Sequence, residues 1–372
     1  MYRLCVAIAL VTMVIGCAEM TELNARKVDG PIVGAIRWDA WTGGGVTTVV
    51  EKTLGPKQFH FRLPWFAEVI GENEVKIDGS PEGVMDREID WAADAGLDYW
   101  VFGLPPQTGG IRSMGVALSQ YLASPKRGRI NFCLILGGVL KVNDDHWPAE
   151  RDRIIRLLRE PGYQTVLGGR PLIYVFWGGE YPWKRFAEFQ EAIRAEGLNP
   201  YYTFMGWWPG ADYRNVSPKG FDAVSNYAAA HDKPRFADLV GHVEHRYWKR
   251  AVDGDTRYIP LVTSGWDKRP RQANLVPWEE GAEYRTQKVF PAQPTPAELA
   301  AHLRNAITFV NEHPEVCEAR AIIIYAWNEY DEGGWIAPTR GADGNPNTER
   351  LDAIRTVLEP QSPSKPRSHD SE

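Results

Sequence analysis

The sequence has few cysteines and no block of basic residues. It contains 4 Cys in 372 residues, and two of these lie in the N-terminal segment, which leaves Cys133 and Cys317 for the folded body. Two cysteines without a spaced pattern make neither a disulfide framework nor a zinc site, so we expect both to be small buried hydrophobic residues. The net charge of −6, with no basic block, argues against nucleic acid as a partner.

The sequence also lacks a glycine-rich phosphate loop and a clear metal site. The stretch "WTGGG" (41–45) after the first predicted strand is not G-x-G-x-x-G, and we predict no helix at that point. His242 and His245 lie three residues apart on a predicted helix without a third ligand. We therefore expect no cofactor and no metal.

Aromatic residues are abundant instead, with 15 Trp, 15 Tyr and 13 Phe. A core accommodates many of them, but the indole ring of Trp is also wide, flat and well suited to stack on the apolar face of a sugar. This composition makes a carbohydrate a candidate partner.

The first residues, "MYRLCVAIALVTMVIGC", are typical of an export signal. Arg3 precedes an apolar run from Leu4 to Ile15, whose 12 residues are too few to span a bilayer. The end of the run, "VIGC", resembles a bacterial lipobox, which implies a signal peptide at 1–16, lipidation of Cys17 and a linker at 17–30. We then expect an exported protein of the bacterial cell envelope, in the periplasm or at the outer membrane, held to the membrane only by its lipid anchor. An ordinary signal peptide or an uncleaved anchor is the alternative.

Eight short runs of apolar, β-branched and aromatic residues predict buried strands, mostly separated by helical patterns. The strands are expected at 32–41, 97–104, 130–138, 171–177, 200–208, 221–228, 257–267 and 321–329. Helices are expected at 83–95, 148–160, 182–196, 235–250, 295–312 and 347–358. Thr295, Pro296 and Glu298 mark one helix start as cap, first residue and N3. This alternation predicts a (β/α)8 TIM barrel, with an open doubly wound sheet as the alternative.

The barrel is expected to form one domain over residues 31–360, and we expect a monomer. Two long connections, 42–82 and 268–294, are expected at the active face, the first with a small hairpin or lid. The tail 361–372 lacks apolar residues and is predicted to be disordered.

Ligands of such a barrel bind at the carboxyl ends of the strands, where this sequence gathers polar groups and indoles. The candidates for substrate binding at these ends are Trp38, Asp39, Trp177, Trp207, Trp208, Tyr227, Trp266, Asp267, Asn328 and Trp335. Asp39 and Asp267 have the alternative of capping the loops that follow them.

Two further carboxylates, Glu329 and Glu332, follow the apolar run "AIIIYAW". They lie three residues apart on the turn "EYDEGG", where Gly333 and Gly334 let the backbone bend, so they can face one pocket. Glycosidic cleavage needs one acid for the leaving oxygen and one base or nucleophile, and two neighbouring carboxyls split each other's pKa. Asp331, between them, is expected to face solvent or to hold a loop amide.

The stretch "AWNEYDEGGWIAPT" resembles the "NEWxEG" segment of the endo-α-mannosidase family of glycoside hydrolases and of the related WbsX-like proteins. Three other stretches are similar to these proteins: "GLDYWVFGL", "RPLIYVFW" and "YIPLVTSGWDKRPR". The resemblance spans strands one to eight and is specific at strands seven and eight.

This resemblance implies a (β/α)8 barrel of retaining glycosidases that needs no metal. It implies that Glu332 is the acid/base for the glycosidic oxygen and that Glu329 takes the proton of the substrate's own 2-hydroxyl, which attacks the anomeric carbon. Asn328 would orient a carboxylate or a sugar hydroxyl. The sequence departs from the family's pattern where Tyr330 replaces Trp and Asp331 replaces His, so mannan is only one possible substrate.

We therefore expect an exported, lipid-anchored glycoside hydrolase of a polysaccharide or oligosaccharide. Glycosyl transfer is an alternative, because some WbsX-like proteins are described as glycosyltransferases. A non-catalytic glycan-binding lipoprotein is another.

Overall fold

The apolar runs form parallel strands around a common axis. The computed structural model describes residues 30–109, 111–176, 179–279 and 283–359, so the predicted leader, Cys17 and the tail from 361 lie outside the described residues. The parallel strands follow one another in the order β10, β11, β1, β4, β5, β7, β8 and β9. Their bounds are Ile32–Arg37 (β1), Tyr99–Leu104 (β4), Asn131–Leu136 (β5), Arg170–Val175 (β7), Tyr201–Gly206 (β8), Ala223–Asn226 (β9), Leu261–Thr263 (β10) and Ala321–Tyr325 (β11).

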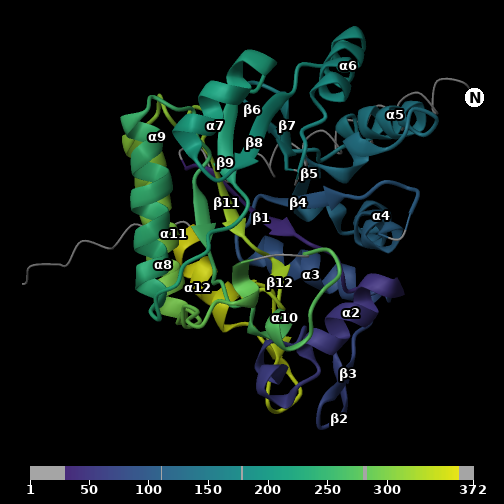
Figure 1. The fold of residues 1–372 in the computed structure, drawn as a ribbon, viewed down its shortest axis with the longest axis vertical. Helices are drawn as coiled ribbons and strands as arrows, with labels where there is room; N and C mark the ends of the chain where they lie inside the picture. The colour runs from purple at the N-terminus through teal and green to yellow at the C-terminus, as the bar shows by residue number, and fades with distance from the viewer. Residues whose placement is uncertain (1–29, 110, 177–178, 280–282, 360–372) are drawn as a thin grey trace, which may run out of the picture.

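The first and last strands of the barrel pair in parallel, Ile32 opposite Ala321, so the two ends of the described chain meet in the sheet (Figure 1). Between β9 and β10 the ring closes through a single bridge, Val224 to Tyr258. The sheet is thus the nearly closed barrel that the alternation predicts, and the TIM-barrel prediction is confirmed.

Helices surround this barrel on the outside (Figure 1). They are Glu82–Asp94 (α3), Val116–Ala123 (α4), Trp147–Leu158 (α5), Trp183–Ala195 (α6), Pro209–Val216 (α7), Phe236–Val243 (α8), Lys249–Asp253 (α9), Pro296–Glu312 (α11) and Glu349–Leu358 (α12). A π-helical turn, Glu244–Trp248, joins α8 to α9. The capping box of Thr295 and Glu298 is present at the start of α11. In the described part of the chain, no helix combines the length and the apolar character that crossing a membrane requires.

Four helices were not predicted, and one of them is Arg269–Ala273 (α10), which lies within the connection expected at 268–294. The prediction of no helix at "WTGGG" is wrong, because Gly44–Leu54 (α2) begins there, and α4 and α7 were not predicted either. The segment 42–82 also carries the predicted hairpin, Glu68–Gly71 (β2) with Glu74–Lys76 (β3). Several strands end earlier than predicted, so their last residues belong to loops at the carboxyl face.

The barrel strands are buried throughout, which their apolar composition predicts. All five residues of β11 are at most 1% exposed. Cys133 on β5 and Cys317 before β11 are both free and buried, as predicted. Polar side chains therefore concentrate beyond the strand ends, where the candidate site lies.

Candidate active site

A small hairpin beyond β11 presents the two candidate glutamates. Asn328–Glu329 (β12) pairs antiparallel with Gly334–Trp335 (β13), with Glu329 opposite Gly334. The turn between them needs its glycines. Gly333 has φ +86°, and a Cβ there would lie 2.5 Å from the backbone nitrogen of Asp267. The bend predicted from "EYDEGG" is thus present, and it brings Glu329 and Glu332 to the same buried region, 1% and 7% exposed.

Glu332 is surrounded by donors. Its Oε1 accepts a hydrogen bond from Arg271 Nη1, and its Oε2 accepts one from the Tyr325 hydroxyl at 2.7 Å. Lys268 Nζ lies 3.3 Å from the same Oε2. Burial alone would raise the pKa of Glu332, but the charges of Arg271 and Lys268 outweigh it and lower that pKa to about 2. Glu332 is therefore ionised in the free site.

Glu329 has the opposite environment. Its Oε1 accepts a hydrogen bond from the Tyr227 hydroxyl at 2.5 Å, while its buried Oε2 has no partner among the described residues. Burial and then the charge of Glu332 raise the pKa of Glu329 well above its usual value, although Arg271 and Tyr227 oppose this. The environment therefore favours a proton on Glu329 over one on Glu332. The role implied for Glu332 by the family resemblance requires that proton at the other carboxyl.

Asp331 is not exposed, so the expectation that it faces solvent is wrong. Its side chain is 0% exposed, and both of its oxygens accept hydrogen bonds from Arg271, at 2.7 Å from Nε and 3.1 Å from Nη2. The reason is a matched buried cation, because a carboxylate can be buried when a guanidinium fork satisfies both oxygens.

A loop residue completes this charge cluster. Glu279 Oε1 lies 2.6 Å from both Lys268 Nζ and Arg271 Nη1. Beside it, the ring of Trp278 packs 5.7 Å from that of Trp38, and the Arg271 guanidinium lies 5.1 Å from the Trp38 ring. Two indoles therefore form a wall next to the cations that hold Glu332.

Several predicted residues come together here. Contacts link seven of them: Glu329, Glu332, Tyr227, Asn328, Asp39, Trp38 and Trp266. Asn328 Oδ1 accepts from the Trp38 amide, and its Nδ2 donates to Asp39 Oδ1. Trp266 packs against the ring of Tyr325, and Lys268 Nζ lies 4.6 Å from the centre of the Trp266 ring. Arg37 also pairs with Asp39, so Asp39 acts on the site through Asn328.

Other predicted residues lie elsewhere. Asp267 is 0% exposed and pairs with Arg62 and Arg269, and it accepts from the Arg269 amide as the alternative cap role predicts. Trp335 is buried, with the Arg350 guanidinium 3.8 Å from its ring centre, so it offers no free face to a sugar. Trp177 lies outside the described residues.

Trp207 and Trp208 differ from these, because they are 46% and 49% exposed. Asp212 accepts hydrogen bonds from both of their amides, at 2.8 and 2.6 Å, which fixes the turn after β8. Arg246 covers one face of Trp208, with its guanidinium 4.0 Å from the ring centre. Trp207 and Trp208 are thus exposed rings at the carboxyl end of a barrel strand.

Sequence reasoning missed the cations Lys268 and Arg271, the hydroxyl of Tyr325 and the loop residues Trp278 and Glu279. The signal for the cations was the basic stretch "KRPR" after strand seven, on the face where acids were expected. Tyr325 gave a weaker signal, because a tyrosine within a fully buried strand needs a partner for its hydroxyl.

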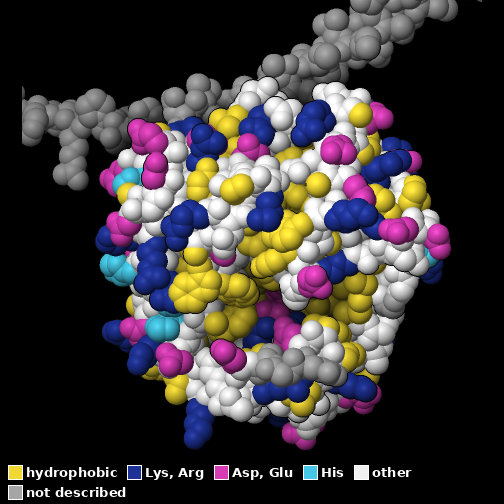
Figure 2. Space-filling model, turned by 45° about the horizontal axis from the view of Figure 1, so that its top comes forward, with side chains coloured by type: hydrophobic (Ala, Val, Ile, Leu, Met, Phe, Trp, Pro, Cys, Tyr) yellow, Lys and Arg dark blue, Asp and Glu magenta, His cyan; other side chains and the backbone are white. Residues whose placement is uncertain are grey.

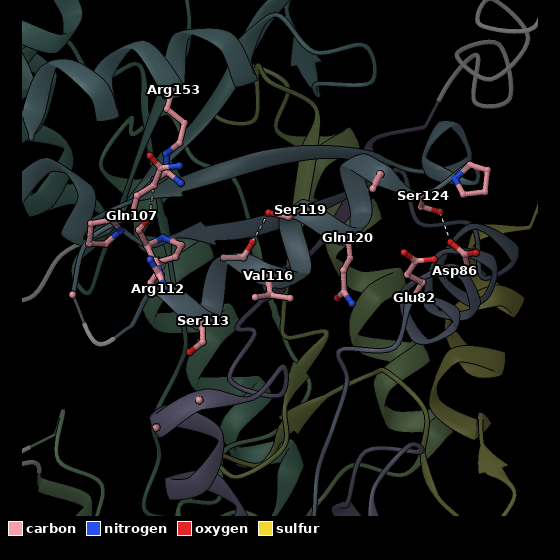
Figure 3. A pocket seen from close by; sticks show the side chains of 18 residues that line it. Glu82, Asp86, Gln107, Arg112, Ser113, Val116, Ser119, Gln120, Ser124 and Arg153 are labelled. Atoms are coloured by element: carbon pink, nitrogen blue, oxygen red, sulfur yellow. Dashed lines mark hydrogen bonds between the residues drawn. The ribbon is translucent and has the colours of Figure 1, made fainter.

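One face of the molecule is hollowed, with acidic and basic side chains inside and apolar side chains around the opening (Figure 2). A separate surface groove of about 970 Å³ runs along α4 and contains neither candidate glutamate. Arg112 and Arg153 lie near one end of it, and Glu82 and Asp86 near the other (Figure 3). The groove has no aromatic lining, and the chemistry points to the β12–β13 hairpin.

The fold and the site define a (β/α)8 barrel protein with buried, oppositely perturbed carboxyls at the end of the last barrel strand. Residues 140–345 match the family described as Glycosyltransferase WbsX, more than half of the chain, and the chain belongs to this family. No curated protein matched.

Solved structures support the fold. The chain is similar to the GH99 endo-alpha-mannosidase from Bacteroides thetaiotaomicron in complex with BIS-TRIS-propane, with a TM-score of 0.53, 13% identity, and 88% of this chain and 95% of that chain covered. A second structure of that enzyme gives a TM-score of 0.51, 13% identity, and 87% and 95% coverage. At this identity the likeness establishes a shared fold.

Proposed function

We propose that this protein is a glycoside hydrolase that cleaves O-glycosidic bonds of a polysaccharide or oligosaccharide, with Glu329 and Glu332 as its reacting carboxyls. The observation that carries this proposal is a pair of neighbouring buried glutamates in opposite environments, which favour charge on Glu332, beside Arg271 and Lys268, and a proton on Glu329, which keeps one oxygen without a partner among the described residues. Glycoside hydrolysis needs this state, one acid and one base, at the start of the reaction. The aromatic wall of Trp38 and Trp278 and the exposed Trp207 and Trp208 are suited to sugar rings.

The roles follow the family resemblance. Glu332 protonates the leaving oxygen, and Glu329 takes the proton from the substrate's 2-hydroxyl, so the hydroxyl oxygen attacks the anomeric carbon and the configuration is retained after water opens the intermediate. Because the environment of the free site favours the proton on Glu329, that proton must pass to Glu332 after the substrate binds and before the bond breaks. Arg271 and Lys268 then face a neutral carboxyl. Asn328, held by Asp39 and the Trp38 amide, orients a sugar hydroxyl or a carboxyl.

The test is the release of reducing ends from a panel of polysaccharides, α-mannans included, by the protein without its leader. We expect release by the wild type, its loss in Glu332→Gln and Glu329→Gln, and no change in Glu68→Gln, an exposed glutamate of the β2–β3 hairpin. A loss of only a few-fold in Glu332→Gln would refute its role as the acid.

Two other functions give distinct results in the same experiment. The family's description favours glycosyl transfer, which would appear as transfer of sugar from a nucleotide sugar to a glycan acceptor without hydrolysis. A glycan that raises the melting temperature of wild type and both variants, with nothing cleaved, would instead indicate a binding module.

Export and lipid anchoring are part of the proposal and rest on the leader. Incorporation of labelled palmitate by the full chain, and its loss in Cys17→Ala, is the expected result. Labelling that persists in the variant would refute the anchor at Cys17.

A further inference from the structure

Arg271 joins the two sequence segments that carry the site. It lies in "KRPR" (268–271) on Arg269–Ala273 (α10), and it reaches the hairpin that bears "NEYDE" (328–332). Its side chain is 1% exposed. Two nitrogens, Nε and Nη2, bind Asp331, while Nη1 binds Glu332 and Glu279. One guanidinium therefore fixes the relative positions of three carboxyls.

The reaction proposed above makes unequal demands on these carboxyls. Glu332 must change from ionised to protonated and back in each cycle, so it cannot serve as the lasting counter-ion of a buried arginine. A buried guanidinium that loses its counter-ion is strongly destabilised. Asp331 can supply the lasting charge, because it is 0% exposed and both of its oxygens already bind Arg271.

We propose that Arg271, locked in place by Asp331, is a positioning residue that orients the Glu332 carboxyl and governs when it holds the proton. This inference rests on the proposed function. It also gives a physical reason for the acid at position 331, where the family's pattern has His: an aspartate there matches the buried guanidinium. The pKa of Arg271 is raised well above its usual value, since the carboxylate charges outweigh the opposing effect of burial, so the residue stays charged.

Arg271 is not alone in facing Glu332. Lys268 and the Tyr325 hydroxyl also bind Glu332. Glu329, the other carboxyl of the pair, accepts a hydrogen bond from Tyr227. Glu279 contacts Lys268 as well as Arg271. Removing Arg271 alone leaves Lys268 in place, so we expect the Glu332 titration to move toward its ordinary range without reversing the order of the pair.

The first experiment is the pH dependence of kcat/KM for Arg271→Met, Arg271→Lys, Asp331→Asn and the double variant Arg271→Lys/Asp331→Asn. An opposite charge at this range shifts a carboxyl by about 1–3 pH units, so in Arg271→Met the acidic limb should rise by at least about one unit. In Arg271→Lys and in Asp331→Asn, kcat should fall about ten-fold or more while KM changes little, because neither Arg271 nor Asp331 is proposed to contact the substrate. The kcat of the double variant should be no lower than that of the more impaired single variant, because both substitutions disrupt the same Arg271–Asp331 pair.

Arg170→Lys is the matched control. Arg170 also pairs with an aspartate, Asp222, through one nitrogen, Nη2, which lies 2.8 Å from each carboxylate oxygen, at the amino end of β7, away from the site. Its kcat and acidic limb should equal those of the wild type. An unmoved limb in Arg271→Met, or additive losses in the double variant, would overturn the inference.

A second measurement needs no substrate and separates this inference from the proposed function. The carboxyl carbon of Glu332 can be followed by NMR in protein with labelled glutamate, and assigned by its absence in Glu332→Gln. If no glycan is cleaved but the Glu332 midpoint rises in Arg271→Met, the hydrolase proposal fails and the control of Glu332 by Arg271 stands. If the midpoint is the same in both proteins, the inference fails. Arg271→Gln, which also removes the charge but keeps a polar side chain, serves the same titration if Arg271→Met does not fold.

Discussion

Replacing Arg62 by Ala should destabilise the protein by about 3 kcal/mol, because it breaks a buried ion pair. Arg62 and Asp267 are both 0% exposed and lie 2.5 Å apart, and Arg62 Nη1 also donates to the backbone oxygen of Asp267 at 3.0 Å. The loss falls at the lower end of the usual range of about 3–5 kcal/mol, since Asp267 keeps Arg269 as a second cation. At about 2 °C for each kcal/mol in a chain of this size, the melting temperature should fall by about 6 °C.

The matched control is Arg269→Ala, which removes the other cation from the same carboxylate. Arg269 is 56% exposed, and an exposed ion pair contributes only about 0–1 kcal/mol. Urea unfolding of the two variants and the wild type measures the difference. Equal losses in Arg62→Ala and Arg269→Ala would refute the reasoning, because burial would then not determine the cost.

The pH dependence of this difference has a defined sign. Burial raises the pKa of Asp267, but Arg269 and Arg62 outweigh it and lower that pKa below its ordinary value. The stabilisation is therefore complete above the unfolded pKa, about 3.9, and disappears as the pH falls through the lower folded value. The difference in the free energy of unfolding between the wild type and Arg62→Ala should decrease only below about pH 4.

Three further predictions concern the site. Tyr227→Phe removes the hydrogen bond that opposes the rise in the pKa of Glu329, so the basic limb of kcat/KM should move to higher pH, as measured on any glycan that is cleaved; an unmoved limb would contradict this. Gly333→Ala should lower the free energy of unfolding, measured in urea, by about 2 kcal/mol or more, because it combines positive φ with a clash at Asp267. Gly168 has φ +73° but open space around it, so Gly168→Ala should cost only the backbone strain of about 1–2 kcal/mol. Equal costs in the two variants would rule out the clash. Trp207→Ala and Trp208→Ala should each raise KM for a long glycan about 3–10-fold without changing stability, in contrast to the exposed Ile70→Ala; an unchanged KM would remove both rings from the binding surface.

The sequence allowed the barrel and the location of its acids to be predicted, because both are local patterns. Runs such as "AIIIYAW" identify buried strands, and residues at strand ends share one face once the strands are parallel. Helix α2 was missed because "GGVTTVVEKTL" begins with glycines and is rich in β-branched residues, which disfavour helices; its buried face, including Val46 and Val50, decides the outcome.

Pairing over long sequence distances could not be predicted. Asp331 and Arg271 are 60 residues apart, and Arg62 and Asp267 are 205 apart. A lone Asp next to a glycine-rich turn is typical of an exposed residue, and only the fold brings it a buried cation. For the same reason Asp267 was proposed as a ligand group, although its charge is already satisfied by two arginines.

Hydrogen-bond satisfaction separates Glu329 from the other buried acids of this site. Asp267 and Asp331 accept hydrogen bonds from arginines on both oxygens. Glu329 keeps one buried oxygen without a partner among the described residues. A buried carboxyl with an open oxygen lowers stability, and an apolar side chain in its place would commonly raise it. Its presence next to an ionised glutamate at the carboxyl end of the barrel therefore favours a working catalytic pair over a barrel that only binds glycans.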